Sequence, residues 1–275
     1  MDGVEIFYFS GTGNSLAVAR DMAERLSANL TPVTSLMDQE SIDIEADVIG
    51  FVFPIYDFKP PPIVEDVVRK LEGIDSKYLF AICTYGLAPA QSLRHFDTVL
   101  RSRGGQLSAG FAVYMPHSGI GSSTITKTQQ EEMFRSWKDR LEGICETIDA
   151  REESKIESSS LLFNFSKNIR MVSHAMTFAW RLLLKGTDSL GFTFSEACHA
   201  CGICEKVCPV RNIEIVNGKP IWSDHCAGCF ACLNWCPKEA ISVGGLDLGI
   251  KPYHHPDVKL PDMMRQRSHT ADSGS

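Results

Sequence analysis

Residues 4–26 read VEIFYF, then SGTGNS, then LAVARDMAERL. The first run is apolar enough for a buried strand at 4–9, and the third carries apolar residues at helical spacing over 15–26. A strand, a glycine-rich turn and a helix in this order usually place a phosphate at the N-terminus of the helix. The stretch therefore predicts an α/β fold with a phosphate-binding turn at 10–15.

The turn does not match the two commonest phosphate-binding fingerprints. Gly11 and Gly13 fit the start of the dinucleotide pattern G-x-G-x-x-G, but Leu16 stands where a third small residue must allow close helix–strand contact. The G-K-[ST] of a P-loop is missing. The polar residues instead suit a phosphate monoester, which hydroxyls and backbone N–H groups enclose without a cation. The candidate phosphate-binding residues are Ser10, Gly11, Thr12, Gly13, Asn14 and Ser15.

The pattern of positions 4–150 extends the α/β prediction. Further buried strands are expected at 47–53, 78–83 and 110–115, with a short edge strand at 30–33. Helical patterns cover 62–71, 90–102 and 128–150. Nearly continuous apolar strands that are separated by helices indicate a parallel sheet covered on both faces.

Composition limits the classes of function. The chain has 275 residues, which suggests about two domains, and its formal net charge of −7 argues against nucleic-acid binding. No signal peptide and no uncharged apolar run of membrane-spanning length is visible. We therefore expect a cytoplasmic protein whose cysteines are reduced thiols or metal ligands.

Eight of the ten cysteines lie between residues 198 and 236. They form two copies of C-x2-C-x2-C-x3-C-P, the first beginning at Cys198 and the second at Cys226. Zinc sites use two ligands per knuckle, and disulfides conflict with a reducing compartment. Three cysteines in one short loop, with a fourth followed by proline, indicate two [4Fe–4S] clusters. The remaining two, Cys83 and Cys145, are expected to be buried apolar thiols.

The cysteine region resembles bacterial-type two-[4Fe–4S] ferredoxins over about residues 196–245. The resemblance implies low-potential electron transfer, with the fourth cysteine of each motif bound to the cluster of the other motif. One cluster would be held by Cys198, Cys201, Cys204 and Cys236. The second would be held by Cys226, Cys229, Cys232 and Cys208.

Residues 4–150 resemble the flavodoxins, whose phosphate loop has the form S/T-x-T-G-x-T/S. The resemblance implies a doubly wound parallel sheet of order 2-1-3-4-5 with FMN beyond the carboxyl ends of its strands. Two further loops would line the flavin ring, with Tyr56 and Tyr85 as aromatic neighbours. The candidate residues there are Pro54, Ile55, Tyr56, Thr84, Tyr85 and Gly86.

The chain thus divides into four parts. Residues 1–150 form the FMN-binding domain, 151–188 a linker with an amphipathic helix, 189–262 the two-cluster domain and 263–275 a polar, frayed tail. The serine-rich stretch at 151–160 is a hinge candidate. The apolar stripe at 162–183 favours a helix packed between domains over one on a membrane surface.

The whole arrangement resembles the flavodoxin–ferredoxin fusion proteins. It implies an electron-transfer protein that passes electrons between FMN, two clusters and a redox partner protein, with no catalytic residue assigned. The first alternative is an FMN-dependent reductase of a small substrate, with His117 and Tyr85 as candidate proton donors. The second is a ferredoxin carried on a flavodoxin scaffold that has lost FMN. The oligomeric state and the partner stay open.

Overall fold

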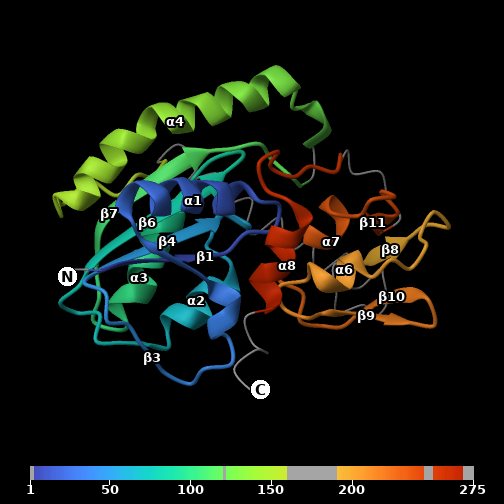
Figure 1. The fold of residues 1–275 in the computed structure, drawn as a ribbon, viewed down its shortest axis with the longest axis horizontal. Helices are drawn as coiled ribbons and strands as arrows, with labels where there is room; N and C mark the ends of the chain where they lie inside the picture. The colour runs from blue at the N-terminus through green and yellow to red at the C-terminus, as the bar shows by residue number, and fades with distance from the viewer. Residues whose placement is uncertain (1–2, 120–121, 160–190, 245–249, 269–275) are drawn as a thin grey trace.

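The computed structural model describes residues 3–119, 122–159, 191–244 and 250–268. Its largest element is a parallel five-stranded sheet in the order β2-β1-β4-β6-β7 (Figure 1). The strands are β1 (Val4–Tyr8), β2 (Asn29–Pro32), β4 (Val48–Pro54), β6 (Tyr78–Tyr85) and β7 (Leu107–Tyr114). Two short strands, β3 (Ile42–Asp43) and β5 (Leu71–Glu72), pair with each other outside this sheet.

The order of the five main strands is therefore 2-1-3-4-5, as in flavodoxin-like folds. The central strands are buried along nearly their whole length, which is why they read as continuous apolar runs. This confirms the fold class expected for the first half of the chain. In such a sheet, ligands bind where the strand order reverses, beyond the carboxyl ends of the strands.

Helices cover both faces of the sheet (Figure 1). Helix α1 (Asn14–Leu26) and the long α4 (Lys127–Asp149) pack together on one face, while α2 (Pro62–Val68) and α3 (Ser92–Arg101) lie on the other. Helix α2 has Pro62 in its first turn, where the missing N–H costs no hydrogen bond. Two short 3₁₀ turns, η1 (Val33–Leu36) and η2 (Ser122–Thr124), complete this half of the chain.

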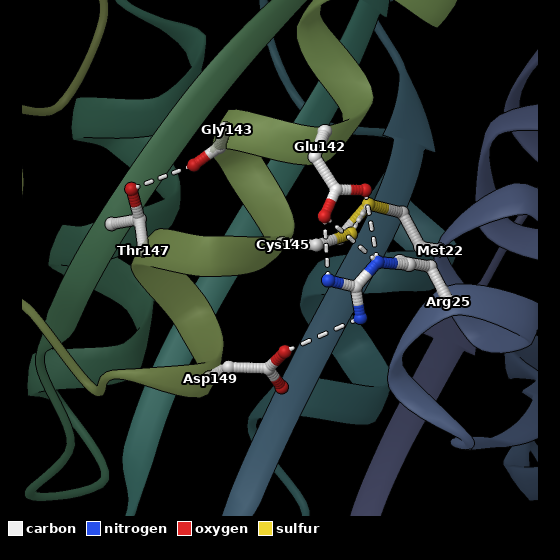
Figure 2. Close-up of polar contacts among 7 residues, drawn as sticks. All are labelled: Met22, Arg25, Glu142, Gly143, Cys145, Thr147 and Asp149. Carbon is white, nitrogen blue, oxygen red and sulfur yellow. Dashed lines mark hydrogen bonds and ion pairs between the residues drawn. The ribbon is translucent and has the colours of Figure 1, made fainter.

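Helix α4 contacts α1 through an ion-pair group and a thiol–thioether contact (Figure 2). The guanidinium of Arg25 donates to both oxygens of Glu142, at 2.9 Å and 2.6 Å, and lies 3.6 Å from Asp149. Beside it, the thiol of Cys145 lies 3.6 Å from the sulfur of Met22. Cys145 and Met22 are both fully buried, as expected for Cys145, so the contact joins the two helices by packing as well as by charge.

The segment after α4, a hinge candidate in the sequence, is hydrogen-bonded to β7 over its described residues. Ser154 N–H donates to Ser108 O and Glu157 N–H to Gly110 O, each at 2.9 Å, so the chain runs along β7. The carboxylate of Glu157 also accepts from Arg140 at 2.7 Å. Residues 151–159 therefore cover an otherwise open sheet edge. The predicted amphipathic helix at 162–183 lies outside the described residues.

The second half of the chain is built from small paired elements. It contains the hairpin of β9 (Ile213–Val216) with β10 (Lys219–Trp222), the pair of β8 (Phe192–Phe194) with β11 (Ile241–Val243), and the short helices α6 (Ile203–Lys206) and α7 (Ala231–Asn234). Helices α6 and α7 begin at equivalent positions of the two cysteine motifs, which matches the sequence repeat. Among the described helices, none is long and apolar enough to cross a membrane.

Helix α8 (Leu260–Ser268) lies between the sheet and the cysteine-rich half (Figure 1). The prediction of a frayed tail is therefore wrong for residues 263–268, while 269–275 lie outside the described residues. Met263 and Gln266 are each only 1% exposed. A polar sequence thus forms a helix because its few apolar positions, and one buried amide, face the protein.

The two halves share one hydrophobic core. Trp235, Val258 and Met263 belong to the same cluster of buried side chains as the strands of the sheet. A second cluster lies within the cysteine-rich half and includes Phe192, Ile213 and Ile241. The cysteine-rich half and helix α8 therefore both pack into the core of the α/β half.

Candidate functional site

Four thiols surround a cavity beneath the β9–β10 hairpin. They are Cys198, Cys201 and Cys204 from the first motif and Cys236 from the second, and we call them the first cysteine set. Ile203, Ile215 and Pro220 are among the apolar residues that line the same cavity. The grouping is the one implied by the crosswise exchange of the fourth cysteine.

A second cavity is surrounded by the other four thiols. They are Cys226, Cys229 and Cys232 from the second motif and Cys208 from the first, and we call them the second cysteine set. Each cavity thus joins three cysteines of one motif to the last cysteine of the other. Among the described residues, no three such ligands converge closely enough for a single metal ion. Thiols arranged around a cavity suit a multi-iron cluster.

The two motifs share positive φ angles at equivalent positions, and these angles curve the chain around both cavities. Ala200 and Gly228 have φ values of 57° and 65°. Gly202 and Phe230, which precede α6 and α7, have φ values of 73° and 55°. These left-handed residues turn the chain tightly between successive cysteines. The internal repeat in the sequence is therefore also a repeat in structure.

Several N–H groups point toward the ligand sulfurs. Backbone N–H groups donate to Cys208 Sγ from Asn212 at 3.2 Å and to Cys236 Sγ from Ala240 at 3.4 Å. Two buried side-chain donors also line the second cavity: Asn212 Nδ2 has no partner among the described residues, and the indole of Trp222 lies at the Cys232 thiol. Sulfurs of a bound cluster accept such hydrogen bonds. The donor groups around this cavity therefore fit a [4Fe–4S] cluster.

Burial favours the protonated form of the thiols that lie deepest in the two sets. It raises the pKa of Cys204 to about 11 and that of Cys229 to about 12, although backbone N–H groups of Glu205 and Ala231 oppose the shift. Because a cluster binds thiolates, cluster assembly must release these protons. No disulfide joins any of the ten cysteines, all of which lie in the described residues.

The two sets differ in exposure. Cys201 is exposed, and Cys198 and Cys236 are half-buried. In the second set, three of the four cysteines are buried, and the set lies against the α/β half. The first set therefore faces solvent, and the second faces the interior of the protein.

Loop 10–15, the predicted phosphate-binding turn, lies at the expected end of β1 but is covered by the last third of the chain. Ser10 N–H donates to Gln266 Oε1 at 2.9 Å, and Gln266 Nε2 donates to Ser10 O at 3.0 Å. The indole N–H of Trp235 donates to Gly11 O at 3.1 Å. A Cβ added at Gly11 would lie 2.5 Å from the carbonyl oxygen of Cys229.

The next residues of the loop are also engaged. His255 N–H donates to Thr12 O at 2.9 Å, and Tyr253 Oη donates to Asn14 Oδ1 at 2.6 Å. The hydroxyl of Ser10 accepts from Gly13 N–H at 3.0 Å within the loop. All six residues of the loop are buried. We call residues 253–266, which supply most of this cover, the C-terminal segment.

The structure brings the other candidate flavin-binding loops near loop 10–15. The hydroxyls of Ser15 and Thr84 lie 2.8 Å apart, and Ile55 N–H donates to Thr84 O at 3.0 Å. Pro54 ends β4, and Tyr56 exchanges two backbone hydrogen bonds with Lys59 across a tight turn. These loops therefore meet at one edge of the sheet, as expected for a flavodoxin-like topology.

The aromatic residues of these loops have protein neighbours. Tyr56 packs edge-on against Phe9, and burial beside Cys229 and Cys226 raises its pKa well above the ordinary value. Tyr85 lies beside Tyr114, with ring centroids 5.5 Å apart. A Cβ added at Gly86 would lie 2.7 Å from Cβ of His117, so that loop is closely packed as well.

FMN therefore does not fit loop 10–15 in the described arrangement. The backbone of Cys229 lies against Gly11, and the C-terminal segment covers the rest of the loop. Neither of the two cavities at the cysteine sets is lined by a residue of this loop. The loop residues have the character of a phosphate site, but their surroundings are those of a packed interface.

Sequence reasoning missed the residues that cover the loop. Trp235, Tyr253, His255, Val258 and Gln266 all contact it from the opposite end of the chain. The apolar spacing of Leu260, Met263 and Met264 is a signal that could have indicated α8. No local pattern marks the single polar side chains that reach the loop.

Comparison with known proteins supports the two-part architecture. Residues 197–241 match the 4Fe-4S dicluster domain family. No curated protein matches the chain. The family match and the observed strand order together show a flavodoxin-like α/β domain joined to a 4Fe–4S dicluster domain, which confirms the resemblance to flavodoxin–ferredoxin fusions at the level of architecture.

Solved structures resemble the first half of the chain only distantly. Rubredoxin oxygen:oxidoreductase from Desulfovibrio gigas is 16% identical with a TM-score of 0.36, over 55% of this chain and 37% of that one. A putative flavoprotein from Bacteroides uniformis is 14% identical with a TM-score of 0.35, over 48% and 97%. A flavodoxin from the domain Archaea is 15% identical with a TM-score of 0.30, over 52% and 98%. The fold assignment rests on the strand order of this chain.

Proposed function

We propose that the chain is an electron-transfer protein that holds two [4Fe–4S] clusters and passes single electrons to and from a redox partner protein. One observation carries the proposal: the eight motif cysteines gather as two sets of four around two cavities, and each set mixes the two motifs. A pair of independent zinc knuckles would keep each motif to itself.

The chain's own residues provide what such clusters need. A bound [4Fe–4S] cluster supplies one-electron redox chemistry. Four cysteines per set leave no iron position for a substrate. Apolar side chains such as Ile203 and Phe230 exclude water, and the N–H donors of Asn212 and Trp222 face the second set. These groups tune the potential of a cluster but perform no bond chemistry.

The first cysteine set is the side that faces a partner. Cys201 is exposed, whereas the α/β half covers the second set. Electron transfer between proteins needs close approach of the redox centres, so the partner docks near Cys201. Cysteines that serve as cluster ligands belong in a reducing compartment, in line with the cytoplasmic location that the sequence predicts.

Transfer between these clusters and FMN is a more specific version of this function. The strand order and the hydroxyls of loop 10–15 favour it. It requires the C-terminal segment and the backbone of Cys229 to leave the loop, and reduction of a small substrate at the flavin requires the same movement. The contacts at this loop therefore support a ferredoxin-like carrier on a flavodoxin-like scaffold.

Anaerobic purification followed by iron, sulfide, zinc and flavin assays tests the proposal. We expect about eight iron and eight sulfide per chain, and two spectroscopically distinct clusters on reduction. An aqueous paramagnetic relaxation agent should broaden the electron paramagnetic resonance signal of the first cluster more than that of the second. Zinc in place of iron would overturn the function. Equal broadening would overturn only the assignment of the outward side.

A further inference from the structure

The two glycines of loop 10–15 allow close approach of another part of the chain. At Gly11, an added Cβ would lie 2.5 Å from Cys229 O and 2.9 Å from Tyr56 Oη. At Gly13, where φ is +97°, it would lie 2.9 Å from Cβ of Val258. Contacts under 3.0 Å are too short for real Cβ atoms, so a side chain at either position would separate the surfaces. The glycines therefore serve a close contact between distant parts of the chain.

Several polar groups of the loop, chiefly its carbonyls, also bond to distant parts of the chain. Its partners come from three separate places: Trp235 after α7, Tyr253 and His255 in an extended stretch, and Gln266 on α8. They form hydrogen bonds with the carbonyls of Gly11 and Thr12, with the N–H and the carbonyl of Ser10, and with the side chain of Asn14. Such matching of buried polar groups is typical of a stable interface.

An ion pair extends the contact beyond the loop. Arg20 on α1 lies 2.9 Å from the carboxylate of Asp262, and it is the largest cause that lowers the pKa of Asp262. The hydroxyl of Thr34 also donates to the backbone carbonyl of Gln266. Helix α8 is thus held at both the loop and the neighbouring elements α1 and η1.

From these contacts we propose that loop 10–15 is the docking seat for the chain's own C-terminal segment and for the backbone of Cys229, and that the folded protein binds no FMN there. Cys229 lies against Gly11 and the segment lies against Gly13, the two glycines at which a phosphate would approach the backbone of the loop. The phosphate-loop sequence serves to position the second cysteine set against the sheet.

The seat has a direct consequence for the second cysteine set. Cys229 contacts Gly11 through its backbone, and Trp235 precedes Cys236, a member of the first set. One loop therefore fixes the chain on both sides of α7, between ligands of both sets. This role in positioning does not depend on electron transfer, so its failure would leave the two-cluster function intact.

Flavin analysis of the full-length holoprotein gives the first test. We expect no flavin in protein purified from flavin-replete cells, and no quenching of FMN fluorescence when FMN is titrated with the protein. One tightly bound FMN per chain would overturn the proposal. The iron and sulfide contents of the same sample show whether the two clusters are present, independently of the flavin result.

Substitution of Gly11 gives the second test. Gly11→Ala places a methyl group against Cys229 O, whereas Gly143→Ala, on the exposed face of α4, meets nothing within 4 Å and is the matched control. We expect Gly11→Ala to increase hydrogen exchange in 253–266 and around α7 while exchange in the central strands is unchanged. Exchange at the wild-type rate in those segments would overturn the docking role.

Tyr253→Phe covers the case in which Gly11→Ala does not fold. It removes only the hydroxyl that donates to Asn14 at 2.6 Å and adds no bulk. Loss of one buried hydrogen bond should raise exchange in the C-terminal segment about fivefold. Unchanged exchange in this variant would count against the seat. If Tyr253 instead served only the general stability of the fold, hydrogen exchange would also increase in the central strands of the sheet.

Discussion

The side-chain amide of Gln266 pairs with both backbone groups of Ser10, although 256 residues separate the two along the chain. Ser10 and Gln266 are each only 1% exposed. The pair is therefore a buried, reciprocal contact between the first strand–helix turn and the last described helix. It links the loop that defines the α/β fold to the segment that sequence reasoning took for a frayed tail.

Gln266→Ala should destabilise the protein strongly for a single polar substitution. It leaves the N–H and the carbonyl of Ser10 buried and unpaired, and each such group costs about 1–3 kcal/mol. We expect a loss of about 2–4 kcal/mol in the free energy of unfolding, measured from urea denaturation of the holoprotein. Gln106→Ala, at an exposed position, should change it little. Equal stabilities of these two variants would contradict the importance of the pair.

His255 should make stability depend on pH in mildly acidic solution. The residue is 5% exposed, and burial lowers its pKa from 6.5 to about 4, against the opposing charges of Asp257 and Asp21 and with smaller contributions from Lys138 and His254. Between these two pH values the ring is neutral in the folded state but protonated in the unfolded state. The free energy of unfolding therefore falls as pH drops from about 6.5 to about 4. The full effect is about 3 kcal/mol.

Comparison of urea midpoints at several pH values checks the role of His255. His255→Gln should flatten the pH dependence between about 6.5 and 4 relative to the wild-type protein. Acid also releases clusters, but this contribution is common to both proteins. A wild-type slope in His255→Gln would show that other groups cause the pH dependence.

Cysteine substitutions should reveal the crosswise ligand sets. Cys208→Ser should remove the same cluster as Cys232→Ser, although the two residues lie in different motifs. Likewise, Cys236→Ser should resemble Cys201→Ser. Iron should fall from about eight to about four per chain in each case. If Cys208→Ser instead resembled Cys201→Ser in its electron paramagnetic resonance spectrum, each motif would hold its own cluster.

Trp222→Phe should lower the reduction potential of the second cluster. The indole of Trp222 lines the second cavity beside the Cys232 thiol, and an N–H donor to cluster sulfur stabilises the more negative, reduced state. Redox titration followed by electron paramagnetic resonance should show a shift for that cluster and none for the first. Trp137→Phe, which loses a hydrogen bond to Asp21 on α1 instead, is the matched control. An unchanged potential in Trp222→Phe would exclude the hydrogen bond.

The sequence was most informative where local chemistry and spacing coincide. Apolar runs at 47–53 and 78–83 could be read as buried parallel strands, and the turn at 10–15 as a strand–helix connection. The grouping of Cys208 with Cys226 was accessible because the C-x2-C-x2-C-x3-C-P motifs resemble those of two-cluster ferredoxins, in which the fourth cysteine binds the other cluster. Each of these inferences needs only neighbouring residues or a repeated motif.

What covers loop 10–15 could not be read from the sequence in the same way. Tyr253, His255 and Gln266 contribute isolated polar contacts over a long separation, with no periodicity to mark them. Gly11 and Gly13 suit a phosphate as well as they suit a close backbone contact. Only the fold distinguishes these uses, because it alone shows what lies against the loop.

During synthesis of the chain, loop 10–15 is made well before the C-terminal segment that covers it. Loop 10–15 leaves the ribosome 256 residues ahead of Gln266, so at about 5–20 residues per second it waits roughly 13–50 s for its last partner. During that interval the nascent sheet exposes an unfilled turn with free amide groups. Chaperones, or small anions, therefore have a window to occupy the turn before the end of the chain closes over it.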